Sequence, residues 1–348
     1  MRVAVVGAGI VGSATAAYLL DAGADVTCYE AVAPMSGRSA GASRIFRLAH
    51  GTPELVRLAQ ASLDGYRAWG ERAGAELIDH SGLVVTGPLV DAWPAAMSAA
   101  GAEYRLTDRL DLPILRVPGR ALVDPAGGVL DAHSTGRYLA AKTTGVVVRE
   151  RVDRLEHHDD TTRVWTAGGP QDFDATVICA GAGTAVLAGQ VGIPIPAEVG
   201  HHARFSFRLR DPAAHPPCIL EYSGASVGTY QHLTGPGLWA VGAHLPADEV
   251  AWAVGRATVV ARARDVTSRY VRENLDGVED KPVEELYCTF PVDWGDGYIV
   301  ERRGGFLAVH GDNLFKLAPV LGRLLGEAAL HGTTPEPTHA GRGGSSLR

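Results

Sequence analysis

The sequence is poor in the residues on which disulfide frameworks and metal centres depend. It contains four cysteines in 348 residues, widely spaced and with no C-x-x-C pair. This spacing predicts neither a zinc site nor a disulfide-stabilised fold, and it is typical of a protein kept in a reducing compartment. We therefore expect a cytoplasmic protein without a bound metal.

An excess of positive charge is also missing. The chain has 32 lysine and arginine residues against 39 aspartate and glutamate residues, which gives a formal net charge of -7 at pH 7. Such a surface offers no basic patch to a nucleic acid or to an anionic membrane. The apolar residues 1–20 imitate a signal peptide or a membrane span, but they lack a basic n-region and an A-x-A cleavage site. We expect a small molecule as partner, and neither a nucleic acid nor a membrane.

Apolar residues are abundant, at 46% of the chain, which is enough for one large domain or two intertwined ones. The N-terminal residues show a regular order of elements. Residues 2–6 predict a buried strand, residues 10–22 a helix, and residues 25–29 a second strand that leads into Glu30. This order is typical of a nucleotide-binding unit, in which Glu30 would accept hydrogen bonds from a ribose.

The turn between the first strand and the helix carries the pattern G-x-G-x-x-G. Gly7 permits the tight turn, Gly9 lets the backbone approach a pyrophosphate, and Gly12 allows close packing of helix and strand. The helix begins at Ile10 and Val11, where free N–H groups and the helix dipole would face the phosphates. We predict a bound dinucleotide, although this unit alone does not separate FAD from NAD.

Two segments in the middle of the chain favour FAD. Residues 174–187, DATVICAGAGTAVL, form an apolar run followed by a turn of small residues that includes Ala180 and Gly181. This segment resembles the second flavin-contact strand of the D-amino-acid oxidase and sarcosine oxidase superfamily. Residues 145–156 resemble the strand that in this superfamily carries a valine against the adenine, and that valine would be Val152.

A segment near the C-terminus, GFLAVHGDNLFKLAPVLGRLLGEAAL, predicts a strand, a glycine turn and a helix. It resembles the flavin-and-substrate motif of monomeric sarcosine oxidases and N-methyltryptophan oxidases, in which a G-x-G-F-K segment passes close to the flavin ring. Phe315 and Lys316 match the end of that motif, whereas Asp312 to Leu314 depart from its glycine-rich part. The resemblance implies that the following residues lie beside the cofactor: Gly311, Asn313, Leu314, Phe315 and Lys316.

The stretch ASRIFRLAHG places two arginines three residues apart with no acidic residue nearby in sequence. Ser43, Arg44 and Arg47 fit the [ST]-R-x-x-R segment of the sarcosine oxidase family. The resemblance implies that Arg44 supports the flavin and that Arg47 binds the substrate carboxylate, with Lys316 on the other side. A guanidinium suits this role because it binds a carboxylate through two parallel hydrogen bonds. The alternative is that both arginines neutralise acids elsewhere in the fold.

The resemblance covers residues 1 to about 330 and implies an α/β fold. A Rossmann-type FAD-binding domain, glutathione-reductase-like and of the D-amino-acid-oxidase type, would hold an inserted α+β substrate domain with a mixed sheet. The expected FAD-binding domain is discontinuous and comprises residues 1–75, 140–200 and 285–335. The expected substrate domain comprises residues 76–139 and 201–284, followed by a flexible tail, 336–348.

One departure from the family concerns the covalent attachment of the flavin. Matching Tyr287 and Pro291 to the family's tyrosine and proline puts Glu285 at the position where the family has its tethering cysteine. Cys288 follows three residues later. We therefore expect noncovalent FAD, with a tether at Cys288 as the alternative.

A second departure concerns the reaction with oxygen. Matching Gly242 and His244 to the family's G-x-H puts Ala240 where monomeric oxidases carry a lysine that promotes this reaction. Loss of a cation beside the flavin should slow oxidation by oxygen. His244 is a candidate to hold the amine or modulate the flavin, and Tyr230 and Tyr287 are candidates to line the substrate pocket.

The predicted function is FAD-dependent oxidation of the C–N bond of a small amino acid, or imino acid, to an imine. The expected acceptor is oxygen, with hydrogen peroxide as product. Three alternatives stay open. They are an amine dehydrogenase with another electron acceptor, an NADPH-dependent monooxygenase, and a flavin-binding protein without catalysis.

Overall fold

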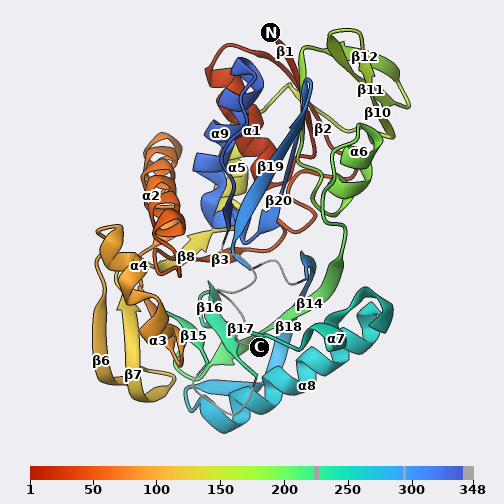
Figure 1. Cartoon of the computed structure of the whole chain (residues 1–348). Helices are drawn as coiled ribbons and strands as arrows, with labels where there is room; N and C mark the ends of the chain where they lie inside the picture. Colours follow the sequence, from red (N-terminus) through yellow and green to blue (C-terminus); the bar gives the residue numbers. More distant parts are fainter. Residues whose placement is uncertain (223–226, 293–294, 340–348) are drawn as a thin grey trace.

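The computed structural model describes residues 1–222, 227–292 and 295–339. Figure 1 shows two groups of elements, one above the other, each built on a sheet. The upper sheet has the order β21-β19-β20-β13-β1-β2-β9; the strands from β20 to β9 run parallel, and β19 and β21 pair antiparallel. Its strands are β1 (Arg2–Val6), β2 (Asp25–Tyr29), β9 (Val147–Val148), β13 (Ala175–Ile178), β19 (Gly297–Arg303), β20 (Phe306–Asp312) and β21 (Thr338–His339).

The two faces of the upper sheet pack against different elements, because successive side chains of a strand point to opposite sides. Val3 and Val5 of β1 lie in a core with residues of four helices, α1 (Ile10–Asp21), α2 (Pro53–Ala73), α5 (Ala132–Lys142) and α9 (Ala318–His331). Ala4 and Val6 lie in a second core on the opposite face. That core includes residues of a small antiparallel sheet and a short helix, β10 (Arg154–His158), β11 (Thr161–Thr166), β12 (Gly169–Phe173) and α6 (Thr184–Gln190).

The lower sheet has the order β18-β14-β17-β16-β15-β5-β7-β6. Its strands are β5 (Leu83–Thr86), β6 (Arg105–Asp111), β7 (Arg116–Asp124), β14 (Val199–Leu209), β15 (Cys218–Glu221), β16 (Thr229–Gly235), β17 (Leu238–Ala243) and β18 (Val278–Pro291). Helix α8 (Arg256–Asn274) covers one face (Figure 1), where Phe205, Phe207 and Trp239 pack with Tyr270. Further short helices are α3 (Leu89–Ala92), α4 (Pro94–Ala99), α7 (Ala247–Val250), η1 (Gly181–Gly183) and η2 (Trp252–Val254).

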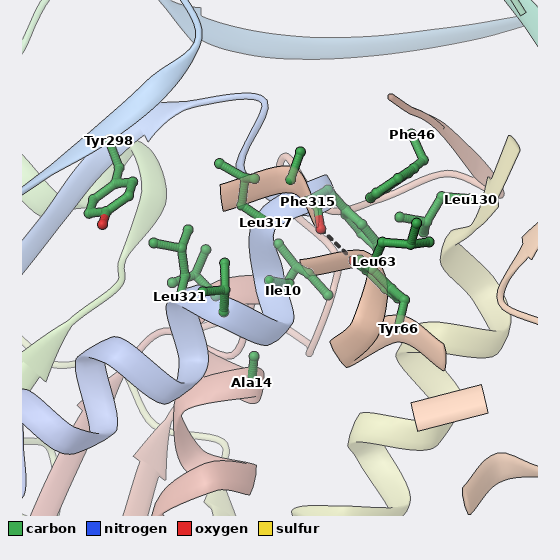
Figure 2. Packing of buried hydrophobic residues seen from close by; sticks show 14 of the residues in the cluster. Ile10, Ala14, Phe46, Leu63, Tyr66, Leu130, Tyr298, Phe315, Leu317 and Leu321 are labelled. Atoms are coloured by element: carbon green, nitrogen blue, oxygen red, sulfur yellow. Dashed lines mark hydrogen bonds between the residues drawn. The ribbon is translucent and has the colours of Figure 1, made fainter. Parts of the chain in front are cut away.

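A small sheet carries the arginine segment. Strand β3 (Ser43–Phe46) pairs with β8 (Gly128–Asp131), which also pairs with β4 (Ile78–Asp79). Figure 2 shows Phe46 of β3 in one cluster with Leu63, Tyr66 and Phe315. The hydroxyl of Tyr66 donates a hydrogen bond to the carbonyl oxygen of Phe315. This core therefore fixes η3 (Leu314–Leu317), the short helix that contains Lys316.

The α/β fold class predicted from the sequence is confirmed, but some details differ. Residues 285–291 were assigned to the FAD-binding part, whereas their pairing with β14 puts them in the lower sheet. Val152 was expected on a strand, yet it lies in irregular chain between β9 and β10. Of the tail predicted to be flexible, residues 340–348 lie outside the described residues, and residues 338–339 form β21. In the described part of the chain, no helix is long and apolar enough to cross a membrane.

Candidate active site

A cavity of about 1520 Å³ lies between the two groups of elements. This volume exceeds that of an ordinary pocket for one drug-sized ligand, so the cavity can hold a dinucleotide together with a second small molecule. All but two of the predicted site residues line it, and the exceptions, Gly12 and Ser43, are buried. The lining residues are Gly7, Gly9, Ile10, Val11, Glu30, Arg44, Arg47, Val152, Ala180, Gly181, Tyr230, His244, Tyr287, Gly311, Asn313, Leu314, Phe315 and Lys316.

The glycine turn at one end of the cavity has the geometry that a dinucleotide requires. Gly7 has a φ of +102°, and a Cβ atom added there would lie 2.5 Å from the carbonyl oxygen of Cys179. A Cβ atom at Gly12 would lie 1.9 Å from the carbonyl oxygen of Gly7, so this glycine serves the packing of α1 on the turn. The first turn of α1 contains no acidic residue, which leaves the positive end of its dipole available to phosphates.

The other predicted dinucleotide contacts lie around this turn. The carboxylate of Glu30 accepts hydrogen bonds from the backbone N–H groups of Ala8 and Val32, each at 2.9 Å, which fixes it at the end of β2. Val152 is buried in the core against which Ala180 also packs. The residues present therefore fit FAD: the glycine turn and the start of α1 would hold its pyrophosphate, and Glu30 would hold a ribose.

Arg44 is buried and has no carboxylate partner among the described residues. Its guanidinium donates to the carbonyl oxygens of Ser43 at 2.7 Å, Arg38 at 2.9 Å and Ala40 at 2.5 Å. It also lies over the ring of Phe315, 5.1 Å from the centroid. Burial, with a smaller effect of Arg204, lowers the pKa of Arg44 to about 10, so it stays charged at neutral pH. Arg44 thus ties together the backbone on one side of the cavity.

Arg47 and Lys316 meet in the cavity, as predicted, but a carboxylate of the protein itself lies between them. Arg47 forms an ion pair with Asp296, and Lys316 Nζ lies 2.9 Å from Asp296 Oδ1. Arg47 also donates to the carbonyl oxygen of Ala49 and stacks over Trp93 at 4.9 Å. The alternative interpretation, in which both arginines neutralise acids of the fold, is met only in part: Arg47 has an acidic partner in Asp296, and Arg44 has none among the described residues.

The charges of this cluster are unequal at neutral pH. Burial alone would raise the pKa of Asp296, but Arg47 and Lys316 outweigh it and hold that pKa well below its usual value. Burial, reinforced by Arg47, lowers the pKa of Lys316 to about 8. Burial and the two cations lower the pKa of His50 to about 3, so its imidazole is neutral. Two cations and one carboxylate leave one net positive charge below pH 8.

Histidine and tyrosine side chains on β14 and β16, and directly after β15 and β17, form a wall of the same cavity. His244 Nε2 lies 3.0 Å from the hydroxyl of Tyr222, and the hydroxyl of Tyr230 lies 3.3 Å from His202 Nε2. Burial lowers the pKa of both His244 and His202 to about 4. The two imidazoles are therefore neutral at pH 7 and can exchange hydrogen bonds with a ligand without adding charge.

Tyr287, the other tyrosine predicted to line the substrate pocket, contacts a different histidine and an arginine. Its hydroxyl lies 2.7 Å from His201 Nδ1, and the guanidinium of Arg256 lies over its ring at 4.1 Å from the centroid. Tyr287 thus lines the cavity from β18, where its partner is His201.

The sequence analysis did not identify Arg204, a further buried cation that lines the cavity. Residues paired across neighbouring strands share one face of a sheet, and Arg204 of β14 pairs with Gly242 of β17. Ala240 lies two residues before Gly242 and therefore shares that face. Arg204 Nη1 lies 2.5 Å from His232 Nε2, and no carboxylate of the described residues forms an ion pair with it. The alternation of the β14 sequence HHARFSFRL could have revealed it, because His202, Arg204 and Ser206 form a polar face opposite the apolar face of Ala203, Phe205 and Phe207.

The predicted tether position faces away from the cavity. Glu285 forms an ion pair with Arg264 of α8 at 2.7 Å and is absent from the cavity lining. Cys288 does line the cavity, with Sγ 3.5 Å from His202 Nδ1. Burial raises the pKa of the Cys288 thiol. The residue that matches the family's tether by sequence is thus an exposed acid, and a thiol lies nearby on the inner face.

Comparisons with curated proteins found relatives of this chain. A monomeric sarcosine oxidase of Streptomyces avermitilis is 27% identical over 381 aligned positions, which cover 96% of this chain and 95% of that protein. The monomeric sarcosine oxidase of Bacillus sp. strain B-0618 is 28% identical over 214 positions, covering 56% of this chain and 55% of that protein.

Solved structures share the fold. The open form of NikD, described as an unusual amino acid oxidase essential for nikkomycin biosynthesis, superposes with a TM-score of 0.82 at 21% identity and covers 97% of both chains. The L-proline dehydrogenase of P. horikoshii reaches a TM-score of 0.76 at 16% identity, covering 96% of this chain and 94% of that one. The family model described as FAD dependent oxidoreductase matches residues 2–328. The predicted family is confirmed, and the chain belongs to the DAO family of FAD-dependent oxidoreductases.

Proposed function

We propose that the chain oxidises the C–N bond of a small amino acid, with a secondary or primary amine, to an imine. The observation that carries this proposal is the meeting of Arg47 and Lys316 at one end of a cavity that fits FAD at the other. Two buried cations bind a carboxylate through charge-assisted hydrogen bonds, and a carboxylate held there fixes the carbon next to the amine. The names of the curated relatives support the same substrate class.

The wall of histidines and tyrosines suits the amine end of such a substrate. Oxidation of a C–N bond requires the neutral amine, whose lone pair becomes part of the C=N bond. His244 and His202 are neutral at pH 7, because burial lowers their pKa to about 4. Tyr222 holds His244 in place through a hydrogen bond of 3.0 Å. A neutral imidazole can accept a hydrogen bond from the amine and thereby orient it.

The reaction removes two electrons and two protons from the substrate. The C–H bond next to nitrogen and one N–H bond are broken as the C–N bond becomes C=N. When bound, FAD supplies the acceptor for the two electrons. Water then hydrolyses the imine, and we infer that oxygen finally takes the two electrons and two protons and leaves as hydrogen peroxide.

We further infer that FAD is held without a covalent bond. Glu285, at the position of the family's tether, pairs with Arg264 and does not line the cavity. Precipitation of the protein with acid should therefore release the yellow colour into solution. Colour that stays with the protein, and is released after Cys288→Ser substitution, would assign a tether to Cys288 instead.

The proposed activity is tested with the visible spectrum of the purified flavoprotein under nitrogen. N-methyl, cyclic and primary amino acids are added in turn, and bleaching of the flavin band by one class is the expected result. NADPH is added separately, because bleaching by NADPH alone would indicate a monooxygenase and overturn the proposal. Bleaching by an amino acid that is reversed by a dye and not by air would indicate a dehydrogenase.

A further inference from the structure

The carboxylate of Asp296 binds both Arg47 and Lys316, the two cations of the proposed anion subsite. Its Oδ1 atom accepts from Lys316 Nζ at 2.9 Å and from Asn313 Nδ2 at 2.8 Å. Its Oδ2 atom pairs with Arg47 and lies 3.4 Å from His50 Nδ1. Both oxygens of one internal carboxylate therefore have the partners that a substrate carboxylate would need.

The backbone around Asp296 favours this position. Gly295 has a φ of +80° and Gly297 a φ of +109°, conformations that other residues rarely adopt. Asn313, which donates to Asp296, also has a positive φ of +55°. Positive φ values at these three residues thus accompany the hydrogen bond between Asn313 and the carboxylate of Asp296. The two glycines adopt a positive φ without steric cost, whereas the same conformation at Asn313 costs free energy and persists because the surrounding structure holds it.

Two carboxylates cannot both use these partners. Like charges at hydrogen-bonding distance from the same two cations repel each other, and the repulsion is stronger in a buried site than in water. A substrate carboxylate must therefore displace Asp296 from Arg47 and Lys316. A ligand that offers only a carboxylate gains little by this exchange. A ligand that also contacts the wall of His244 and Tyr222 gains binding energy that offsets the cost of displacing Asp296.

We propose that Asp296 is a specificity-determining residue, an internal carboxylate that competes with the substrate carboxylate for Arg47 and Lys316. The inference rests on the proposed function, because it takes these two cations as the substrate's anion subsite. It implies that the wild-type protein discriminates against small carboxylates that lack the remaining contacts.

The test is the binding of acetate to the FAD-loaded protein, followed as a change in the flavin absorbance. Asp296→Asn should bind acetate more tightly than the wild type, on the order of 10- to 100-fold, because a competing charge is removed while the hydrogen-bonding shape is kept. Acetamide, which has no charge, should show no such gain. Glu301→Gln, which removes an exposed acid of β19, serves as the matched control and should leave acetate binding unchanged.

Acetate binding to Asp296→Asn that is unchanged or weaker would overturn the proposal and make Asp296 a support for the two cations. A crystal structure of the wild-type protein at saturating acetate gives a second test that needs no variant. The expected result is acetate on Lys316 and Arg47 with Asp296 turned away, and Asp296 still on both cations would contradict it. Because neither measurement requires turnover, failure of this inference is distinguishable from failure of the proposed amino acid oxidation.

Discussion

The protonation of Lys316 should control the binding of carboxylates between pH 7 and pH 10. Burial and the neighbouring Arg47 lower the pKa of Lys316 from 10.5 to about 8. The ammonium is then roughly nine-tenths protonated at pH 7 and roughly one-tenth protonated at pH 9. Because a carboxylate binds the charged form, affinity should be highest below pH 8 and should fall by up to about tenfold per pH unit above it.

The structure limits both the size of this effect and its source. A hydrogen bond to a charged group contributes about 1.5–3 kcal/mol, so the total loss of affinity should lie between about 10-fold and 150-fold. His50 cannot cause the change, since its pKa is lowered to about 3. Tyr222 cannot either, because burial raises its pKa to about 12. Asp296 has a pKa well below its usual value and stays charged throughout.

The assay is acetate binding to the flavoprotein, measured by flavin absorbance at each pH. Acetate carries no amine, so it does not titrate in this range. Lys316→Arg keeps its charge up to pH 10 and should bind acetate without a break near pH 8, whereas Lys316→Met should bind weakly at every pH. A wild-type profile that is flat from pH 7 to pH 10, or a break that persists in Lys316→Arg, would refute the assignment.

Three further predictions concern other parts of the cavity. Arg47→Met should lower kcat/KM for an amino acid by on the order of 100-fold in steady-state kinetics, with exposed Arg57→Met of α2 as an unaffected control. Gly12→Ala should lose FAD, seen as a lower ratio of flavin to protein absorbance, because the added Cβ would lie 1.9 Å from the carbonyl oxygen of Gly7. Arg204→Met should slow the reaction of the reduced protein with oxygen in stopped-flow measurements, since it removes a buried cation from the face that also holds Ala240. An unchanged oxygen rate in Arg204→Met would exclude that role.

The sequence predicts local structure well where a few neighbouring residues determine it. The first strand, helix and second strand lie within one residue of their predicted ends, because glycine spacing and apolar runs are local signals. Val152 was placed on a strand by the resemblance of residues 145–156 to a strand of the family, but the chain leaves the sheet after Val148.

The site depends more on contacts between distant segments. Asp296 lies 249 residues from Arg47, and no local pattern could show that the two form an ion pair. Arg204 and His232 meet because β14 and β16 both flank β17, which is a property of the sheet order. The residue types needed for a carboxylate subsite were recognisable, whereas the internal carboxylate that occupies it required the folded chain.

The central claim is that Arg47 and Lys316 select an amino acid for oxidation by its carboxylate. The most direct measurement is the rate of flavin bleaching under nitrogen by matched pairs of compounds, such as proline with pyrrolidine and N-methylglycine with dimethylamine. The account predicts that at least one amino acid bleaches the flavin and that its partner without the carboxylate does so at least about 100-fold more slowly. Equal rates within each reactive pair, or bleaching by NADPH and by no amino acid, would contradict it.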